Sequence, residues 1–114
     1  MAELDKMLAL GIPVGLQTGV FYLPYLPKAL RFHFNAHNIV VYGKENGYYS
    51  VSDPVMEQPS LISYDDLVRA RFAKGIAAPR GKMYYVGEVP TGANLKEAII
   101  KGIRQTANDM LNVP

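Results

Sequence analysis

The feature that most constrains the fold of this chain is a pair of β-rich runs separated by Asn46-Gly47. The runs 39–42 (IVVY) and 48–51 (YYSV) consist mainly of β-branched and aromatic residues, which favour strands. Asn and Gly both tolerate the positive φ that a tight turn between twisted strands requires. The stretch 36–54 therefore predicts a β-hairpin.

A hairpin brings its two ends together, so it places His37 beside Asp53. In such a pair the carboxylate accepts from one ring nitrogen of the histidine, and the other ring nitrogen serves a nucleophile. The chain has no Cys. Ser50 and Ser52 alternate onto the strand face opposite Asp53 and lack a GxSxG context, so neither is a convincing nucleophile. From the residues alone, a satisfied polar contact at a sheet edge is the more common explanation of such a pair.

Four segments occur in a characteristic order and spacing: GIPV at 11–14, HNIVVYG at 37–43, YSVSDP at 49–54 and SYDDLVRAR at 63–71. Together they resemble the butirosin biosynthesis protein H N-terminal family. That family is a branch of the papain-like cysteine peptidase and acyltransferase fold and is similar to the double-glycine bacteriocin-processing peptidases. The resemblance covers about residues 8–71, and residues 72–114 match more loosely the segment that continues after that domain.

The resemblance implies a function in antibiotic biosynthesis and a site. His37 falls on the catalytic histidine of the family and Asp53 on its acidic residue. The nucleophilic Cys of the family lies on a helix upstream of Gly11, and we expect the isolated chain to be inactive without it. The implied partners are an acyl-carrier protein or peptide substrate and an upstream Cys-bearing segment or second chain. The implied reaction moves an acyl group from a carrier thioester to an amine.

The predicted fold class is α+β: residues 1–114 form a single domain, a fragment corresponding to the sheet-rich half of a papain-like domain. Its antiparallel sheet comprises strands at 13–17, 37–43, 48–53 and 82–89, and residues 2–10 form a short helix. Ser63 with Asp66, and Asn94 with Glu97, have the capping-box pattern of a helix start. We expect the helices beginning there to flank the sheet.

The last of these helices, 94–112, carries an apolar stripe at helical spacing: Leu95, Ile99, Ile103, Thr106 and Met110. A stripe of this kind needs a partner, which is either the sheet or another chain. The second functional hypothesis is a non-catalytic module that binds a peptide or carrier protein, or assembles, through the 21–27 loop and this helix. Homo-oligomerisation is one form of such assembly.

Residues 18–35 place aromatics between Pro24 and Pro27, which indicates an irregular loop with at most a helical turn near 28–30. Phe21, Tyr22 and Tyr25 either line an apolar substrate channel under this loop or complete the core by burial. His33 is expected to be a half-buried structural residue.

Arg69 and Arg71 could bind an anionic group, although such residues more often form a solvated face or pair with acids on the same helix.

The composition argues against several classes of function. A net charge of +2 without a basic block disfavours nucleic acid. No apolar run approaches the ~18 residues of a membrane span. His33 and His37 find no further His or Cys, so neither a metal nor a cofactor is expected. The lack of Cys fits a reducing cytoplasm.

Overall fold

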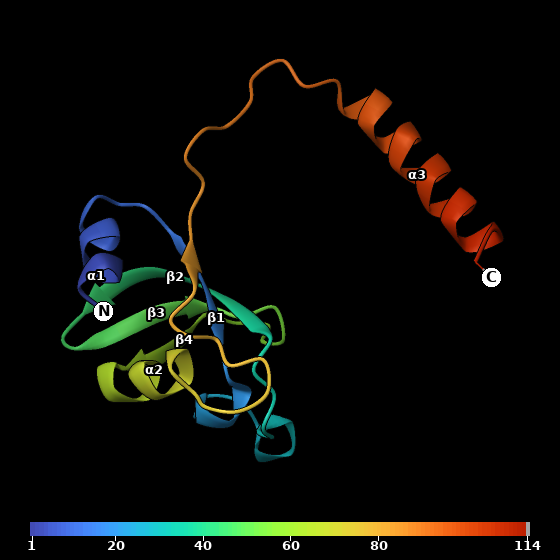
Figure 1. The fold of residues 1–114 in the computed structure, drawn as a ribbon. Helices are drawn as coiled ribbons and strands as arrows, with labels where there is room; N and C mark the ends of the chain where they lie inside the picture. The colour runs from blue at the N-terminus through green and yellow to red at the C-terminus, as the bar shows by residue number, and fades with distance from the viewer. Residues whose placement is uncertain (114) are drawn as a thin grey trace.

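The centre of the molecule is a five-stranded antiparallel sheet in the computed structural model, which describes residues 1–113 (Figure 1). The strand order is β4-β3-β2-β1-β5. The strands are β1 (Val14–Thr18), β2 (His37–Glu45), β3 (Tyr48–Ser52), β4 (Ser60–Ser63) and β5 (Met83–Tyr84). The helices are α1 (Ala2–Ala9), α2 (Tyr64–Arg71) and α3 (Leu95–Leu111), with 3-10 turns η1 (Val20–Tyr22) and η2 (Lys28–Leu30). The α+β class with an antiparallel sheet is confirmed.

The predicted hairpin is present as β2 and β3. Asn46 and Gly47 form the turn with φ of 52° and 78°, the left-handed values that a two-residue type I′ turn requires. Next to the turn Glu45 lies opposite Tyr48. The register then shifts, because Gly43 pairs with Ser50 whereas Val41 pairs with Val51, which leaves Tyr42 as an extra residue in β2. The hairpin therefore contains a β-bulge.

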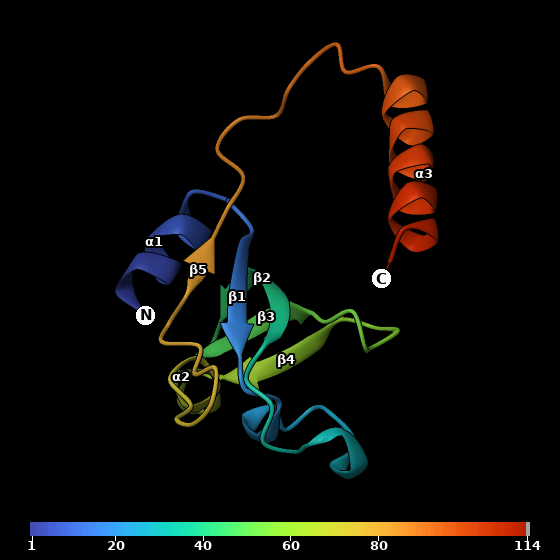
Figure 2. The same ribbon diagram turned by 45° about the vertical axis from the view of Figure 1, so that its right-hand side comes forward.

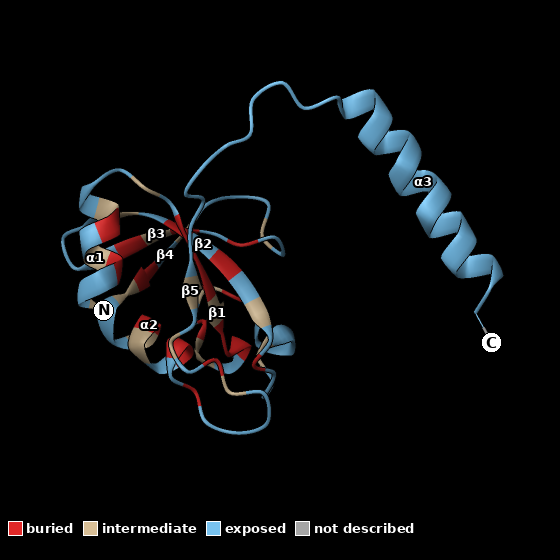
Figure 3. Cartoon of the chain, turned by 45° about the horizontal axis from the view of Figure 1, so that its top comes forward, coloured by how far each residue is buried: buried red, intermediate tan, exposed pale blue. Residues whose placement is uncertain are grey.

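The core lies on one face of the sheet (Figure 3). Alternate residues of the first four strands point into it, as period-2 side-chain geometry requires. They are joined by Leu4 and Met7 of α1 and by Leu67 and Ala70 of α2. Val20, Leu23 and Leu26 complete the core from the 18–35 loop, so the aliphatic residues of this loop are its most buried apolar ones. The strand residues of the core are Val14, Leu16, Ile39, Val41, Tyr49, Val51 and Ile62.

The opposite face of the sheet is open. Val40, Tyr42, Tyr48, Leu61 and Tyr84 are exposed there. The Tyr84 ring lies over Gly15, where a Cβ atom would overlap it, and the Tyr84 hydroxyl donates to Oδ1 of Asn38 at 3.2 Å. The glycine thus permits the close approach of β5 to β1.

Two expectations for the strands were wrong. The strand expected at 82–89 is only two residues long, because Met83 and Tyr84 pair with Leu16 and Gly15 and the chain then leaves the sheet (Figure 2). Conversely, β4 was not among the expected strands. It pairs with β3 from Tyr48 to Val51 and runs directly into the Ser63 cap of α2.

Both capped helices form as predicted. The Ser63 hydroxyl accepts from the Asp66 amide at 3.2 Å, and Asn94 Oδ1 accepts from the Glu97 amide at 3.1 Å. The expectation that both flank the sheet is wrong for α3. None of its residues is buried, and it stands clear of the sheet in two views (Figures 1 and 2). The sheet is therefore not the partner of its apolar stripe in this structure.

Within residues 1–113, no helix combines the length and apolar character that crossing a bilayer demands.

Candidate functional site

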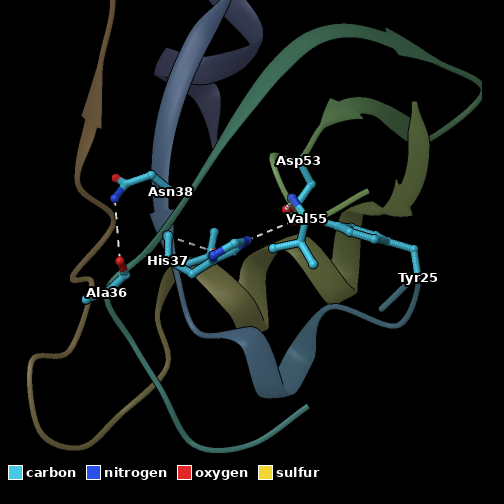
Figure 4. Close-up of polar contacts among 7 residues, drawn as sticks. Tyr25, Ala36, His37, Asn38, Asp53 and Val55 are labelled. Carbon is cyan, nitrogen blue, oxygen red and sulfur yellow. Dashed lines mark hydrogen bonds and ion pairs between the residues drawn. The ribbon is translucent and has the colours of Figure 1, made fainter. Parts of the chain in front are cut away.

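His37 and Asp53 are in direct contact at the ends of the hairpin (Figure 4). Nε2 of His37 lies 2.8 Å from Oδ2 of Asp53. The His37 side chain is 12% exposed and the Asp53 side chain is fully buried, so the contact is shielded from water on the carboxylate side. Such a contact fixes both the ring orientation and the tautomer of a histidine.

Asp53 has further hydrogen-bond donors. Oδ2 also accepts from the Tyr25 hydroxyl at 2.8 Å, and Oδ1 accepts from the Val55 amide at 2.9 Å. A buried carboxylate loses its hydration, and hydrogen-bond donors replace it. Both oxygens of Asp53 are thus engaged, and the carboxyl group is held by the loop, by the following turn and by His37.

Strand pairing positions the histidine backbone. His37 lies opposite Thr18 in the β1–β2 register, and the buried Thr18 hydroxyl donates to the His37 carbonyl at 3.3 Å. The next residue, Asn38, turns away from Asp53, and its side-chain amide donates to the Ala36 carbonyl (Figure 4). The alternation of β2 therefore directs His37, and not Asn38, toward Asp53.

The second ring nitrogen of His37, Nδ1, makes no hydrogen bond within residues 1–113, and the side chain retains some exposure. Ser50 and Ser52 lie on the strand face opposite the buried Tyr49, Val51 and Asp53. The described part of the chain therefore brings an imidazole and a buried carboxylate together and places neither serine of β3 beside them.

The three aromatics expected to line a channel separate into two places. Tyr25 reaches Asp53 with its hydroxyl. Phe21 packs edge-on to Tyr22 with centroids 5.1 Å apart and stacks on His33 at 4.1 Å. Phe21, Tyr22 and His33 line surface pockets that do not include His37 or Asp53.

Three of the single-residue interpretations can be compared with the structure. His33 is exposed rather than half-buried, because it stacks on the outside of Phe21. Arg69 forms a 3.5 Å ion pair with Asp66, in agreement with pairing to an acid on the same helix. Arg71 is only 3% exposed, donates to the Gly81 carbonyl at 2.9 Å and is unsuited to an external anion.

A group of cations and aromatics forms a surface, which we call the basic–aromatic surface. Two adjacent pockets, joined through the Phe21–His33 stack, define it. Among the described residues, the ion pair of Arg69 with Asp66 is the only one that its cations form. Its members are Phe21, Tyr22, Lys28, Arg31, His33, Arg69, Phe72 and Lys74.

Sequence reasoning missed two of the groups that hold Asp53. The Val55 amide could have been found, because an Asp side chain at a turn commonly accepts from the backbone two residues on, and Asp53-Pro54 indicates a turn. Tyr25 had no such signal, since its partner is far along the chain and the loop has no regular hydrophobic pattern.

No cluster of His, Asp and Glu within residues 1–113 is suited to hold a metal ion.

Comparison with known proteins connects this geometry to a family. Residues 1–54 match the family model described as butirosin biosynthesis protein H, N-terminal, and residues 65–114 match a domain of unknown function, DUF4872. No curated protein and no solved structure matches the chain. The first match includes both His37 and Asp53. Residues 1–54 are therefore similar to the butirosin biosynthesis protein H N-terminal family, and a segment similar to DUF4872 follows.

Proposed function

We propose that this chain carries the base and the orienting carboxylate of a papain-like acyltransferase or peptidase-like enzyme of the butirosin H type. His37 takes the proton of a Cys nucleophile through Nδ1, and Asp53 holds the ring and stabilises the imidazolium. The supporting observation is the 2.8 Å contact between Nε2 of His37 and Oδ2 of Asp53, with Nδ1 left free of other partners in residues 1–113. The butirosin H family match over both residues supports it as well.

The Cys in this proposal is supplied by an upstream segment or by a second chain, because residues 1–114 contain none. The isolated chain then has no turnover. A correctly placed acid–base group contributes about 10² to 10⁴ in rate, a contribution that needs a reacting nucleophile. The absence of Cys is compatible with a reducing compartment, and we assign the reaction to the cytoplasm.

The acyl donor in this proposal is an acyl-carrier protein that docks on the basic–aromatic surface. Four cations, Lys28, Arg31, Arg69 and Lys74, line its two pockets, and the chain as a whole has a net charge of only +2. Positive patches attract acidic partners and steer their association. Binding should therefore weaken with salt and with Arg31→Glu, whereas Arg104→Glu on α3 is the control that leaves it unchanged. A peptide substrate that binds independently of Arg31 would point to the peptidase-like alternative.

Reconstitution tests the catalytic proposal. The chain is mixed with the Cys-bearing segment of a butirosin H-type domain, an acyl thioester of a carrier protein and an amine acceptor, and the amide product is followed by mass spectrometry. We expect turnover in the mixture and none with the chain alone. His37→Ala should reduce the rate by about 10² to 10⁴.

Asn38→Ala is the matched control, because it alters the neighbouring residue that turns away from Asp53. Turnover that survives His37→Ala would show that this histidine is not the base. A mixture that forms a stable complex and still has no turnover would also contradict the proposal.

A second candidate function is a non-catalytic assembly module, favoured by the exposed stripe of α3. Leu95, Ile99, Ile103 and Met110 are each more than half exposed. With 17 residues, α3 is only slightly longer than the ~12–15 residues below which an isolated helix is marginal in water. In proteins, packing of an apolar face is the usual source of helix stability. Light scattering distinguishes the two: a dimer that Ile103→Lys dissociates favours assembly, and a monomer at all concentrations opposes homo-oligomerisation.

A further inference from the structure

Oδ2 of Asp53 is shared between two donors. Nε2 of His37 and the Tyr25 hydroxyl each lie 2.8 Å from it. Tyr25 comes from the 18–35 loop, whereas Asp53 ends the hairpin, so the contact joins two parts of the chain that have no strand pairing with each other. The same atom that orients His37 is therefore also tied to the loop.

The loop holds Tyr25 firmly. Leu23 and Leu26, on either side of it, are 0% and 3% exposed, and the Leu26 amide donates to the Leu23 carbonyl at 3.1 Å. The position of the phenol is thus set by core packing rather than by the hydrogen bond alone. Burial, and then the hydrogen bond to Asp53, raise the pKa of Tyr25 well above its usual value, so the hydroxyl is a permanent donor.

Without Tyr25, two groups would remain on the carboxylate: the Val55 amide on Oδ1 and His37 on Oδ2. One fixed backbone donor does not restrain both oxygens, because a carboxylate can rotate about its χ2 bond. A second fixed donor, on the oxygen that His37 uses, removes that freedom. The hydrogen bond from Tyr25 is located where it restrains the contact with the histidine.

We infer that Tyr25 is a positioning residue: its hydroxyl fixes Oδ2 of Asp53 and thereby holds the His37 ring with Nε2–H toward the carboxylate and Nδ1 free to accept a proton. What Nδ1 then serves rests on the proposed function. The hydrogen-bond chain from Tyr25 through Asp53 to His37 is independent of the proposed function, so it can be tested without a nucleophile.

The test uses the full chain labelled with ¹⁵N in its histidine rings. In the wild type we expect the neutral ring of His37 to be the Nε2–H tautomer, with an Nε2 proton that exchanges slowly with water. Tyr25→Phe keeps the aromatic ring and removes the hydroxyl. We expect exchange of that proton to accelerate at least tenfold and the tautomer ratio to move toward an equal mixture.

Tyr22→Phe is the matched control, because it removes a hydroxyl from the same loop at a residue that packs on Phe21 and not on Asp53. It should leave both NMR signatures unchanged. A purely structural Tyr25 would lower stability in Tyr25→Phe with the exchange rate and tautomer of His37 unaffected, and that result would overturn the inference.

If Tyr25→Phe does not fold, 3-fluorotyrosine at position 25 retains the hydroxyl and makes it a stronger donor. The His37 ring-nitrogen shifts must then move, and unchanged shifts would overturn the inference. In the reconstituted mixture Tyr25→Phe should lower kcat about tenfold to a hundredfold at unchanged KM, as expected for a part of an acid–base contribution. If that mixture has no activity in any variant, the proposed function fails while the NMR result still decides the role of Tyr25.

Discussion

The hydroxyl of Tyr49 on β3 donates a 2.7 Å hydrogen bond to Oδ1 of Asp5 on α1. Lys44 on β2 binds the other oxygen of the same carboxylate, also at 2.7 Å. Tyr49 is fully buried, and its burial, followed by the hydrogen bond to Asp5, raises its pKa to about 12. The contact connects α1 to the hairpin that carries the candidate site, and it has a consequence for stability against pH.

Alkaline pH should weaken the fold through Tyr49. Between pH 10, the ordinary tyrosine pKa, and about 12 the unfolded chain releases this proton while the folded chain retains it. The free energy of unfolding therefore falls as the pH rises through this range, and the contribution is complete below pH 10. Tyr49→Phe should reduce the slope, measured by urea unfolding at several pH values from 9 to 12. A slope equal to that of the wild type would contradict this account of Tyr49.

Asp53 should be important for stability as well as for the proposed chemistry. Asp53→Ala leaves the Tyr25 hydroxyl and the Val55 amide without their acceptor. An unsatisfied buried donor costs about 1–3 kcal/mol. Val55 is 52% exposed, so water can replace the acceptor of its amide, and we expect the loss in the free energy of unfolding, measured by urea denaturation, to come mainly from the half-buried Tyr25. Ser52→Ala, at the exposed last residue of β3, should stay within about 0.5 kcal/mol of the wild type. Equal effects of the two substitutions would show that the Asp53 contacts do not stabilise the fold.

Gly15→Ala should detach β5 from the sheet. A Cβ atom at Gly15 overlaps the Tyr84 ring, and β5 has only two residues with which to compensate. We expect hydrogen exchange of the Gln17 amide, which donates to the Lys82 carbonyl at 3.2 Å, to rise at least tenfold. Gly43→Ala is the matched control, because its Cβ atom meets the Ser50 hydroxyl at an ordinary 3.5 Å. Protection of Gln17 that persists in Gly15→Ala would mean that Tyr84 moves without releasing the strand.

The core and α3 should respond differently to truncation. Leu67 of α2 is fully buried, whereas Ile103 of α3 is 64% exposed. Leu67→Ala should lower the free energy of unfolding of the sheet by about 2–5 kcal/mol. Ile103→Ala should change it by no more than about 0.5 kcal/mol in the monomer. The unfolding of the sheet is followed by near-UV circular dichroism of its tyrosines, and a large loss in Ile103→Ala would show that α3 packs on the sheet in solution.

The parts of the fold that could be predicted were those specified by local chemistry. The Asn46-Gly47 turn and the Ser63 and Asn94 caps each depend on residues a few positions apart, and each formed as expected. The placement of α3 depends on whether its apolar stripe packs on the sheet or on another chain, and the sequence of the stripe does not distinguish these partners. The length of β5 likewise depends on where the chain leaves β1, which the β-rich pattern at 82–89 does not reveal.

The candidate site divides in the same way. His37 and Asp53 were found because a hairpin joins its own ends, so a turn that is read from sequence is enough to bring them together. Tyr25 was expected either in a channel or in the core, because an aromatic among prolines says nothing about a partner 28 positions away. A hydrogen bond of that kind becomes visible only once the 18–35 loop is placed against the hairpin.

The bulge at Tyr42 makes the site depend on chain length. From the turn to Gly43, each residue of β2 pairs with one residue of β3. If this register continued without the extra residue Tyr42, the side chain of His37 would lie on the sheet face that carries Ser52. Asp53 would then lie on the other face. The inserted residue exchanges the two faces of the rest of β2, because side chains alternate with a period of two. Insertion or deletion of one residue between His37 and Asp53 thus separates the pair even if both amino acids are kept, whereas a change of two residues can preserve it. In a relative, the number of residues between the His and the Asp therefore matters as much as the two residues themselves. The two side chains can meet only if that number differs from the one in this chain by an even number.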